Sequence, residues 1–416
     1  MKHALSAVLI FSASACLSTA GLDDGSSPSS CSNVQTDVAN CGKCGNSCGS
    51  VAGGLASCMA GSCIATCSTG RGDCDSSYAN GCEVTFATDG ENCGACGRSC
   101  LGGTCTNGSC DPVTLQTLSG LATGVAVDDT SVYYGLNPPG GTTSEIVRID
   151  KDGANAKPIV TGMVAVGSVA VDGTFVYWVE PASNGTANGR ILKSAKDGSA
   201  GVITIASALG VDAHAQLTLA PPKIFWSSFG VLAADNSVNG AGMYACDLSG
   251  CGDTPTAISK SAYVNGGIID GALIYYAQAA VTPQVGVFSC PVAGCGTTPK
   301  QLAGATVGAF QITADSAAIY WTTLSGAVRY DKSAATLSTV VTTTHPLFGI
   351  VVDANNVYFT DTSDGTVASC PITGCTAAPN TYASALVNPG YLAEDAAALY
   401  FSSGSVSAGT ISRVSK

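Results

Sequence analysis

Two histidines, His214 and His345, are the side chains after residue 20 that are best suited to acid–base or metal chemistry. Both are predicted to lie where the last strand of one structural repeat leads to the first strand of the next. Carboxylates that fall on or near the same rim are Glu145, Glu180, Asp212 and Asp235. A histidine beside two carboxylates could hold a metal ion that activates water, or could transfer a proton itself. Such a convergence at the mouth of the channel that the repeats enclose would favour an enzyme.

Other signs of catalysis are absent from the sequence. There is no Gly-x-Ser-x-Gly elbow, no His-Glu-x-x-His pair and no phosphate-binding loop. The predicted inner strands are mostly Gly, Ala, Val and Ile, with Gln216 and Gln311 as rare polar residues. A lone histidine on a rim is usually a solvated side chain. We therefore predict no catalytic residue and no cofactor, and we take as the candidate rim site Glu145, Glu180, His214 and His345.

One turn has the composition of a small oxygen-ligand site. Asp361 and Asp364, followed by Gly365, could present carboxylates to calcium, which prefers oxygen ligands. The EF-hand pattern is absent, and tight turns use Asp in any case because its side chain caps the local backbone. Calcium at Asp361 and Asp364 is therefore the weaker interpretation, and a metal-free turn is favoured.

These residues are positioned by a repeat that runs through residues 111–416. An aromatic doublet recurs at intervals of 38 to 50 residues, which is the period of a β-propeller blade. Most doublets follow a short apolar run and an Asp-based turn, and helical periodicity is nearly absent. The two rings are predicted to pack between blades, one on each face of the sheet. The doublets are Tyr133 and Tyr134, Tyr177 and Trp178, Phe225 and Trp226, Tyr275 and Tyr276, Tyr320 and Trp321, Tyr358 and Phe359, and Tyr400 and Phe401.

The predicted fold class is all-β, a seven-bladed β-propeller over residues 111–416 preceded by a small disulfide-rich domain. The seventh repeat stops after its third strand, while residues 113–118 precede the first inner strand without a blade of their own. We predict that 113–118 supply the fourth strand of blade seven, because this closes the ring and removes two exposed sheet edges. Six blades is the alternative. The pattern resembles the NHL-like and YWTD-like propellers.

Charge and composition exclude some partners. The formal charge is −12, and the 17 basic residues are scattered along the chain. Nucleic-acid binding needs clustered Lys and Arg, so we expect no nucleic-acid partner. A polybasic membrane patch is disfavoured for the same reason.

The first twenty residues have the pattern of an export signal. Lys2 and His3 precede an apolar stretch over residues 4–15 that is too short to span a bilayer. The residues before Cys16 resemble a lipobox, which implies cleavage there and lipidation of Cys16. Cleavage after Ala20 would instead release a soluble protein. Residues 21–30 have linker composition. We expect an outer-membrane or cell-surface lipoprotein that contacts the membrane only through its lipid anchor, or a secreted protein.

The cysteine count supports export. There are 21 cysteines, and removal or lipidation of Cys16 leaves an even number, which in an exported chain predicts a disulfide framework. Three short motifs are predicted to pair within themselves: Cys246 with Cys251, Cys290 with Cys295, and Cys370 with Cys375. Spacing does not give the connectivity of the fourteen cysteines in residues 31–110, which are Cys31, Cys41, Cys44, Cys48, Cys58, Cys63, Cys67, Cys74, Cys82, Cys93, Cys96, Cys100, Cys105 and Cys110.

Zinc is the alternative reading of these cysteines, since paired Cys-x-x-Cys units are zinc-ribbon ligands. It is disfavoured because residues 31–110 contain no histidine and the expected compartment is oxidising. This segment also has too little apolar bulk to form a core, so it must be held together covalently.

An internal duplication is visible in the cysteine-rich segment. Residues 40–48 and 92–100 share the pattern Asn-Cys-Gly-x-Cys-Gly-x-Ser-Cys, and each copy is followed by two further cysteines. With Asn80, Gly81 and Cys82 between the copies, these units resemble the cysteine-rich repeats of myxobacterial surface and secreted proteins. The resemblance covers residues 31–110 and implies an extracellular module of the kind often joined to a β-propeller. It implies no activity.

Taken together, the sequence predicts a non-catalytic binding or adhesion protein. The expected partner is a glycan or a protein, bound by the polar loops 135–145, 179–190, 227–242 and 277–286 on one rim of the propeller. One alternative is a metal-dependent lyase or lactonase of propeller type. Another is a structural component of the cell surface.

Overall fold

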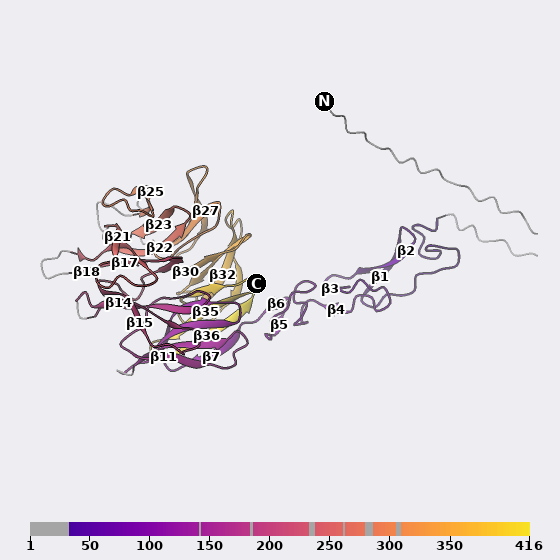
Figure 1. Cartoon of the computed structure of the whole chain (residues 1–416). Helices are drawn as coiled ribbons and strands as arrows, with labels where there is room; N and C mark the ends of the chain where they lie inside the picture. The colour runs from indigo at the N-terminus through magenta and orange to yellow at the C-terminus, as the bar shows by residue number, and fades with distance from the viewer. Residues whose placement is uncertain are drawn as a thin grey trace, which may run out of the picture. The chain divides into compact units, whose positions relative to one another are not determined.

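The computed structural model describes residues 33–140, 143–183, 186–232, 238–260, 263–278, 286–304 and 309–416 (Figure 1). These residues form two compact units. One contains the described residues up to Ser68 together with Ser76–Cys82, and the other contains Thr69–Asp75 and Glu83–Lys416. The second cysteine repeat therefore belongs to the same unit as the propeller, a division that cysteine content alone does not indicate.

Three predictions about the N-terminus lie outside the described residues. They are the export signal over residues 1–20, lipidation of Cys16 and the linker over residues 21–30; Cys31 also lies there. Among the residues that are described, none belongs to a helix long and apolar enough to cross a membrane.

Seven four-stranded antiparallel sheets form the propeller, which confirms the predicted fold class and excludes the six-bladed alternative. The first four blades are β8 (Leu121–Val127), β9 (Ser131–Asn137), β10 (Ser144–Asp150) and β11 (Lys157–Met163); β12 (Val169–Val171), β13 (Phe175–Glu180), β14 (Gly189–Ala195) and β15 (Ile203–Leu209); β16 (Leu217–Ala220), β17 (Lys223–Ser228), β20 (Gly242–Asp247) and β21 (Thr256–Ser259); and β22 (Val264–Asp270), β23 (Leu273–Gln278), β24 (Gly286–Pro291) and β25 (Lys300–Gly304). A short hairpin of β18 (Val231–Leu232) and β19 (Val238–Asn239) extends from blade three.

The last three blades complete the ring. They are β26 (Ile312–Ala314), β27 (Ala318–Thr323), β28 (Gly326–Asp331) and β29 (Thr336–Thr342); β30 (Leu347–Val352), β31 (Asn356–Asp361), β32 (Thr366–Pro371) and β33 (Asn380–Ala383); and β34 (Leu392–Glu394), β35 (Ala398–Ser405), β36 (Ala408–Ser415) and β7 (Val113–Leu118). Strand β7 pairs antiparallel with β36, from Gly409 opposite Leu118 to Arg413 opposite Val113 (Figure 1). An early segment of the chain thus supplies the outer strand of the last blade.

The aromatic doublets form the contacts between blades. In the second strand of each blade the two rings point to opposite faces, and the core divides into seven clusters accordingly. Tyr275 of blade four, for example, shares a cluster with Trp321 of blade five. Tyr400 of blade seven meets Tyr134 of blade one, which closes the ring. The other pairs are Tyr133 with Trp178, Tyr177 with Trp226, Phe225 with Tyr276, Tyr320 with Phe359, and Tyr358 with Phe401.

The first aromatic of the doublet also holds the turn that precedes it. Asp353 accepts the backbone N–H groups of Asn355 and Asn356 through Oδ1, and the Tyr358 hydroxyl donates to its Oδ2 at 2.8 Å. One carboxylate therefore caps the turn and orients the ring. The same tyrosine-to-aspartate bond forms between Tyr133 and Asp128, Tyr177 and Asp172, Tyr320 and Asp315, and Tyr400 and Asp395. Blade three lacks both the tyrosine and the aspartate of this bond. Its doublet starts with Phe225, and its turn contains the cis peptide between Pro221 and Pro222.

The residue after the third strand of every blade is either a lysine that forms an ion pair with the preceding blade or an apolar residue inside a disulfide loop of its own blade. Its backbone N–H bonds back to the turn of its own blade in all seven cases. In four blades this residue is a lysine whose ammonium reaches a turn aspartate of the preceding blade. These pairs are Lys151 with Asp395, Lys196 with Asp128, Lys332 with Asp270, and Lys416 with Asp353.

In the other three blades the same position is apolar and lies inside a short disulfide loop. Leu248, Val292 and Ile372 stand where the lysines stand elsewhere. The bridges are Cys246 to Cys251, Cys290 to Cys295 and Cys370 to Cys375, with Cα–Cα distances of 5.7, 5.6 and 5.0 Å. A blade therefore uses an ion pair or a disulfide at this point, never both.

Replacing Cys370 and Cys375 together by alanine is expected to lower the free energy of unfolding by about 2 kcal/mol. The reason is that the closed loop spans only 5 residues, so the bridge removes less entropy from the unfolded chain than a longer loop would, about 3 kcal/mol at 15 residues. Guanidinium unfolding under oxidising conditions measures the loss. The matched pair Cys246 and Cys251, with the same spacing, should lose the same amount; unchanged stability in both variants would contradict the prediction.

The cysteine-rich segment is held together by disulfides and contains three strand pairs. One pairs the six-residue strands β1 (Gly54–Met59) and β2 (Ser62–Cys67). The other two pair two-residue strands: β3 (Arg71–Gly72) with β4 (Val84–Thr85), and β5 (Cys105–Thr106) with β6 (Ser109–Cys110). The two sequence copies have the same connectivity. Cys41 pairs with Cys58 and Cys48 with Cys63 in the first copy; Cys93 pairs with Cys105 and Cys100 with Cys110 in the second. The remaining described pairs are Cys67 with Cys82 and Cys74 with Cys96, and Cys44 is also disulfide-bonded.

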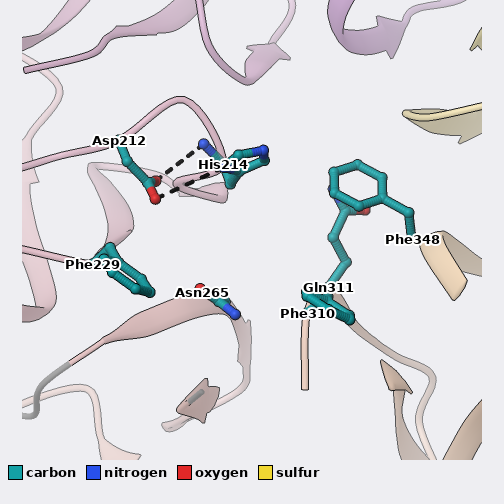
Figure 2. A pocket seen from close by; sticks show the side chains of 7 residues that line it. All are labelled: Asp212, His214, Phe229, Asn265, Phe310, Gln311 and Phe348. Atoms are coloured by element: carbon teal, nitrogen blue, oxygen red, sulfur yellow. Dashed lines mark hydrogen bonds and ion pairs between the residues drawn. The ribbon is translucent and has the colours of Figure 1, made fainter. Parts of the chain in front are cut away.

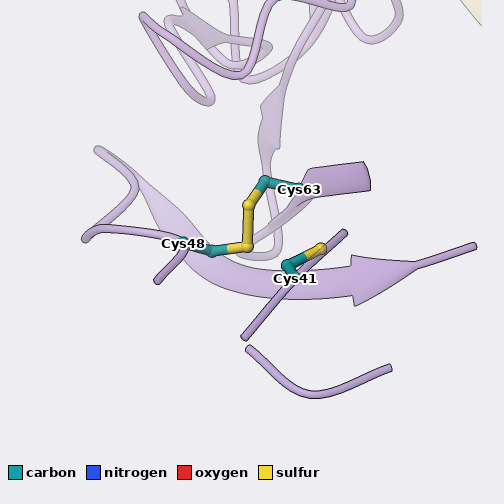
Figure 3. A group of neighbouring side chains, drawn as sticks. All are labelled: Cys41, Cys48 and Cys63. Atoms are coloured by element: carbon teal, nitrogen blue, oxygen red, sulfur yellow. A yellow bond between two sulfur atoms is a disulfide. The ribbon is translucent and has the colours of Figure 1, made fainter. Parts of the chain in front are cut away.

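The zinc interpretation does not apply to these cysteines. The sulfurs of Cys41, Cys48 and Cys63 do gather in one place, and Figure 3 shows the bond between Cys48 and Cys63 beside Cys41. All three sulfurs are committed to disulfides, however, and a metal ligand must be a free thiolate. The buried cysteines are the core of this segment, since few other apolar side chains join their clusters.

Candidate functional site

The four predicted rim residues do not form one site. Glu180, at the end of β13, is 5% exposed and is neutralised by Arg190 on the next strand, whose Nε donates to it at 2.5 Å. Glu145 lies on β10 opposite Leu136, where its charge contributes to the raised pKa of the Tyr134 hydroxyl after burial, the larger cause. His214 and His345 lie in different connections and have different partners. Asp235 lies outside the described residues.

A cavity of about 370 Å³ lies at the mouth of the central channel, beside His214. Figure 2 shows three phenylalanine rings from different blades arranged around it, with polar groups between them. Most of these residues immediately precede an inner strand or begin it, which places them at the narrow end of each blade. The lining residues are Asp212, His214, Phe229, Asn265, Phe310, Gln311 and Phe348.

An aromatic chain crosses the mouth of the channel. The ring of His214 meets the edge of Phe348, with centroids 6.0 Å apart, and Phe348 meets Tyr391 at 5.3 Å. The Tyr391 hydroxyl then donates to the carbonyl of Ala213 at 3.2 Å. Side chains from blades three, six and seven are thereby tied together. Burial, with a smaller contribution from Asp212, holds the pKa of Tyr391 well above its usual range, so this hydroxyl stays protonated.

Below the mouth, the channel is narrowed by a glutamine. The Gln216 amide of blade three reaches across to blade five, where its Nε2 donates to the carbonyl of Ile312 at 2.9 Å. Gly266 of blade four makes this possible, because a Cβ there would lie 2.7 Å from the Gln216 Oε1. The predicted polar residue Gln216 is thus structural. Gln311, by contrast, faces the cavity, and its side-chain amide makes no hydrogen bond with any described residue.

Asp212 and His214 are the polar pair of the cavity. Asp212 accepts the backbone N–H of His214 at 3.0 Å, and its other oxygen lies 3.8 Å from Nδ1 of the imidazole (Figure 2). Hydrogen bonding to Asp212 raises the pKa of His214 above its ordinary value, although burial opposes this. The pair can donate and accept hydrogen bonds, but the described lining supplies only one carboxylate to His214. The convergence of two carboxylates that would favour an enzyme does not occur in this cavity.

His345 does converge with two carboxylates, at a different place. Its Nδ1 lies 3.3 Å from Asp364, and ligand atoms of His345, Asp361 and Asp364 all lie within 4.8 Å of one another. The cluster joins the connection before β30 to the turn after β31, on the rim of blade six. Thr362, which follows Asp361 in the chain, lines a cavity next to the mouth of the channel; the three clustered residues do not line that cavity. The sequence suggested His345 and the two aspartates separately and did not group them.

The aromatic residues of the mouth were missed by sequence reasoning. Phe310, Phe348 and Tyr391 belong to no doublet, so the aromatic repeat does not include them. A usable signal exists: each of these residues comes one or two positions before the inner-strand residue that pairs with the second aromatic of the doublet, namely Ile312, Ile350 and Leu392. The loops predicted to bind lie on blades one to four, and parts of all four lie outside the described residues.

Comparisons with known proteins agree on the fold. No known family model matches the chain, and no curated protein matches its sequence. Among solved structures, the WD40 β-propeller domain of Doa1 is similar over 72% of this chain and 96% of its own, with a TM-score of 0.54 and 10% identity. The extracellular domain of a hybrid two-component system from B. thetaiotaomicron covers 72% of this chain and 39% of its own, at 0.50 and 11%.

A streptogramin B lyase is also similar, over 74% of this chain and 97% of its own, with a TM-score of 0.49 and 13% identity. At such identities, the likenesses with a TM-score of 0.50 or more support the architecture alone. The many disulfides, for their part, indicate an oxidising, extracellular environment. The chain is a seven-bladed β-propeller with a disulfide-rich N-terminal region.

Proposed function

We propose that this chain is an exported, non-catalytic binding protein that holds a glycan in the cavity at the mouth of its propeller channel. The observation that carries the proposal is the composition of the cavity wall. Phe229, Phe310 and Phe348 present apolar faces from three blades, and between them stand polar groups that differ in hydrogen-bonding character: Asp212, His214, Asn265 and Gln311.

Sugar rings match such a wall. A pyranose has an apolar face of C–H groups that packs on an aromatic ring, and an edge of hydroxyls that needs both donors and acceptors. Gln311 provides a carboxamide without another hydrogen-bond partner among the described residues. A volume of about 370 Å³ suits a small ligand or the end of a larger one, at the lower limit of usual ligand sites. A protein surface would not enter it, which favours the glycan over a protein partner.

Export completes the proposal. A disulfide framework persists only in an oxidising compartment, so the ligand is met outside the cytoplasm. Retention at the outer membrane or cell surface through a lipid on Cys16 is part of the same proposal. Mass spectrometry of the mature N-terminus tests it: a diacylated Cys16 is expected, and an unmodified chain starting at Gly21 would leave a secreted binding protein.

Replacing Phe348 by alanine is expected to weaken glycan binding by about 10- to 30-fold, since truncation of a central aromatic contact costs about 1.4–2 kcal/mol. The measurement is a glycan array on the full-length mature protein, followed by calorimetry with the best ligand. Gln311→Ala should weaken binding as well, and it removes no packed ring. Phe175→Ala is the control. Phe175 is also half-buried, but it starts β13 and does not line the cavity.

Three results would overturn the proposal. One is no saturable binding to any glycan, and another is unchanged affinity in both Phe348→Ala and Gln311→Ala. The third is turnover: if a glycan or lactone is consumed and His214→Gln abolishes the reaction, the pair of Asp212 and His214 belongs to an active site and the lyase or lactonase alternative replaces binding. A protein with neither ligand nor activity would fit the structural alternative.

A further inference from the structure

A cluster of His345, Asp361 and Asp364 lies on the propeller, and none of the three lines the cavity beside His214. His345 belongs to the connection between blades five and six. Asp361 ends β31, and Asp364 follows in the turn to β32. Two segments of blade six that are not adjacent in sequence are therefore brought together by three side chains of the kinds that bind metals.

Asp361 is a buried residue, but one oxygen of its carboxylate is not fully enclosed. It is 4% exposed. One of its oxygens accepts the backbone N–H groups of Ser363 and Asp364 at 3.0 and 2.9 Å. The other oxygen has no hydrogen bond and no ion pair with any residue that the structure describes. An ionised carboxylate on a mostly buried residue is stabilised by a charge partner, so its open oxygen would favour a nearby cation.

The equivalent acid of blade two has its cation. Glu180 ends β13 as Asp361 ends β31, and it is buried to the same degree. Its cross-strand partner is Arg190, which neutralises it. The cross-strand partner of Asp361 is Thr366, which carries no charge. In blade six, the position that an arginine fills in blade two therefore supplies no positive charge.

The geometry suits a small metal ion. His345 Nδ1 and Asp364 Oδ1 are 3.3 Å apart, which is the separation of two ligands in a tetrahedral site with bonds of about 2 Å. The ligand atom of Asp361 lies within 4.8 Å of both, so it must approach by at most about 1.5 Å. The Thr344 hydroxyl is also 3.3 Å from Nδ1 and would give up that contact on metal binding.

We propose that His345, Asp361 and Asp364 bind a divalent transition-metal ion of the zinc class, with water completing the coordination. The histidine decides the class of metal: an imidazole nitrogen with two carboxylates suits zinc, nickel or cobalt, whereas calcium takes oxygen ligands in larger number. This replaces calcium as the interpretation of Asp361 and Asp364. Side chains of Asp364 and His345 are 63% and 39% exposed, which leaves the ion an entry path.

The test is zinc binding to the full-length oxidised protein after treatment with a chelator. Calorimetry is expected to show one saturable zinc site. His345→Gln should weaken it by at least about 100-fold, because loss of an outer partner of a ligand already costs about 10- to 100-fold. Asp152→Asn is the control, since Asp152 is an exposed turn carboxylate of blade one outside the cluster, and this variant should bind zinc as the parent does. Calcium at the same concentration should not compete.

Cobalt provides an independent readout. The Co²⁺ form is expected to show visible absorption bands of a four-coordinate ion, which Asp364→Asn should diminish while its melting curve without metal stays that of the parent. Zinc should raise the melting temperature of the parent but not of His345→Gln. The proposal is overturned if the parent binds no zinc, or if His345→Gln binds it as tightly as the parent. Neither outcome bears on glycan binding, which is measured with other variants.

Discussion

Replacing Trp321 by alanine is expected to lower the free energy of unfolding of the propeller by about 3–5 kcal/mol. Trp321 is fully buried and lies in the cluster between blades four and five, where it meets Tyr275 of the neighbouring blade. Removing the indole leaves a cavity in the interface between blades four and five. Because the ring closes on itself, loosening one of the interfaces weakens the support of every blade.

Phenylalanine at the same position should be far milder, within about 1.5 kcal/mol of the parent. The Trp321 indole N–H is buried and has no hydrogen-bond partner among the described residues. The substitution therefore removes a polar group that is not satisfied, and this offsets part of the lost packing. Blades six and seven already use Phe359 and Phe401 at the equivalent position, so a phenyl ring fits the interface.

Tryptophan fluorescence in guanidinium is a direct measurement for both variants. All three tryptophans of the chain, Trp178, Trp226 and Trp321, are in the propeller, so the signal follows this unit alone and two reporters remain in each variant. If phenylalanine proved as damaging as alanine, the assignment of Trp321 to a packing role without a hydrogen bond would be wrong.

Replacing Asp128 by asparagine is expected to cost about 2–3 kcal/mol at pH 7. Besides a longer bond from the Thr130 hydroxyl at 3.3 Å, Asp128 accepts four hydrogen bonds: from the backbone of Thr130 and Ser131 at 2.9 Å each, from the Tyr133 hydroxyl at 2.9 Å and from the ammonium of Lys196 at 2.6 Å. A neutral carboxamide could not accept all four bonds and would leave Lys196, whose side chain is 17% exposed, without its charge partner. The effect combines the loss of a turn cap with the loss of a link between blades one and two.

The difference in unfolding free energy between the parent and Asp128→Asn should disappear at acidic pH. Burial alone would raise the pKa of Asp128, but the bond from Lys196 and those from the turn and Tyr133 outweigh it and hold this pKa far below its usual range. A carboxyl whose pKa is lower in the folded state stabilises the fold above the pKa of the unfolded chain, about 3.9, and loses that contribution as the pH falls below it. Stability of the parent should therefore fall below about pH 4, more steeply than that of Asp128→Asn.

The same titration applies to the equivalent turns. The pKa values of Asp172, Asp353 and Asp395 are also lowered, in each case against the effect of burial, by bonds from the turn backbone and from a tyrosine or lysine. Unfolding midpoints at pH 7 and pH 3 measure the effect. Asp152→Asn is the control, since Asp152 is exposed in a turn of blade one and caps a single N–H. A constant difference between parent and Asp128→Asn at both pH values would contradict the linkage.

The architecture could be predicted because each of its determinants is local and repeated. The spacing of the doublets gives the number of blades, and alternation along a strand sends the rings of Tyr320 and Trp321 to opposite faces. The pairing of Cys370 with Cys375 also follows from their nearness in the chain. In the cysteine-rich segment spacing was insufficient: Cys74 pairs with Cys96 across 22 residues, and no local rule selects that partner.

The sites could not be predicted because their members come from different blades. Phe348, His214 and Tyr391 are far apart in sequence and meet only where the blades converge on the channel. His345 and Asp364 are nearer to each other, yet nothing in their spacing indicates that a connecting loop lies against a turn after β31. Partners also decide roles: Glu180 and Asp361 look alike in the sequence, and only the strand opposite shows that one faces Arg190 and the other Thr366.

The repeat and the dense cysteines therefore established the class of this protein from sequence alone: an all-β chain with a propeller and a disulfide-rich segment. Each is a property of short stretches, and short stretches carry enough information to specify strands, turns and hairpin bridges. The tertiary structure decided the rest: Gln216 is bonded across the channel whereas the Gln311 amide faces the cavity, and Glu180 is paired with an arginine on the next strand whereas Asp361 is not. Both differences rest on contacts between separate strands or blades, and such contacts exist only once the chain has folded.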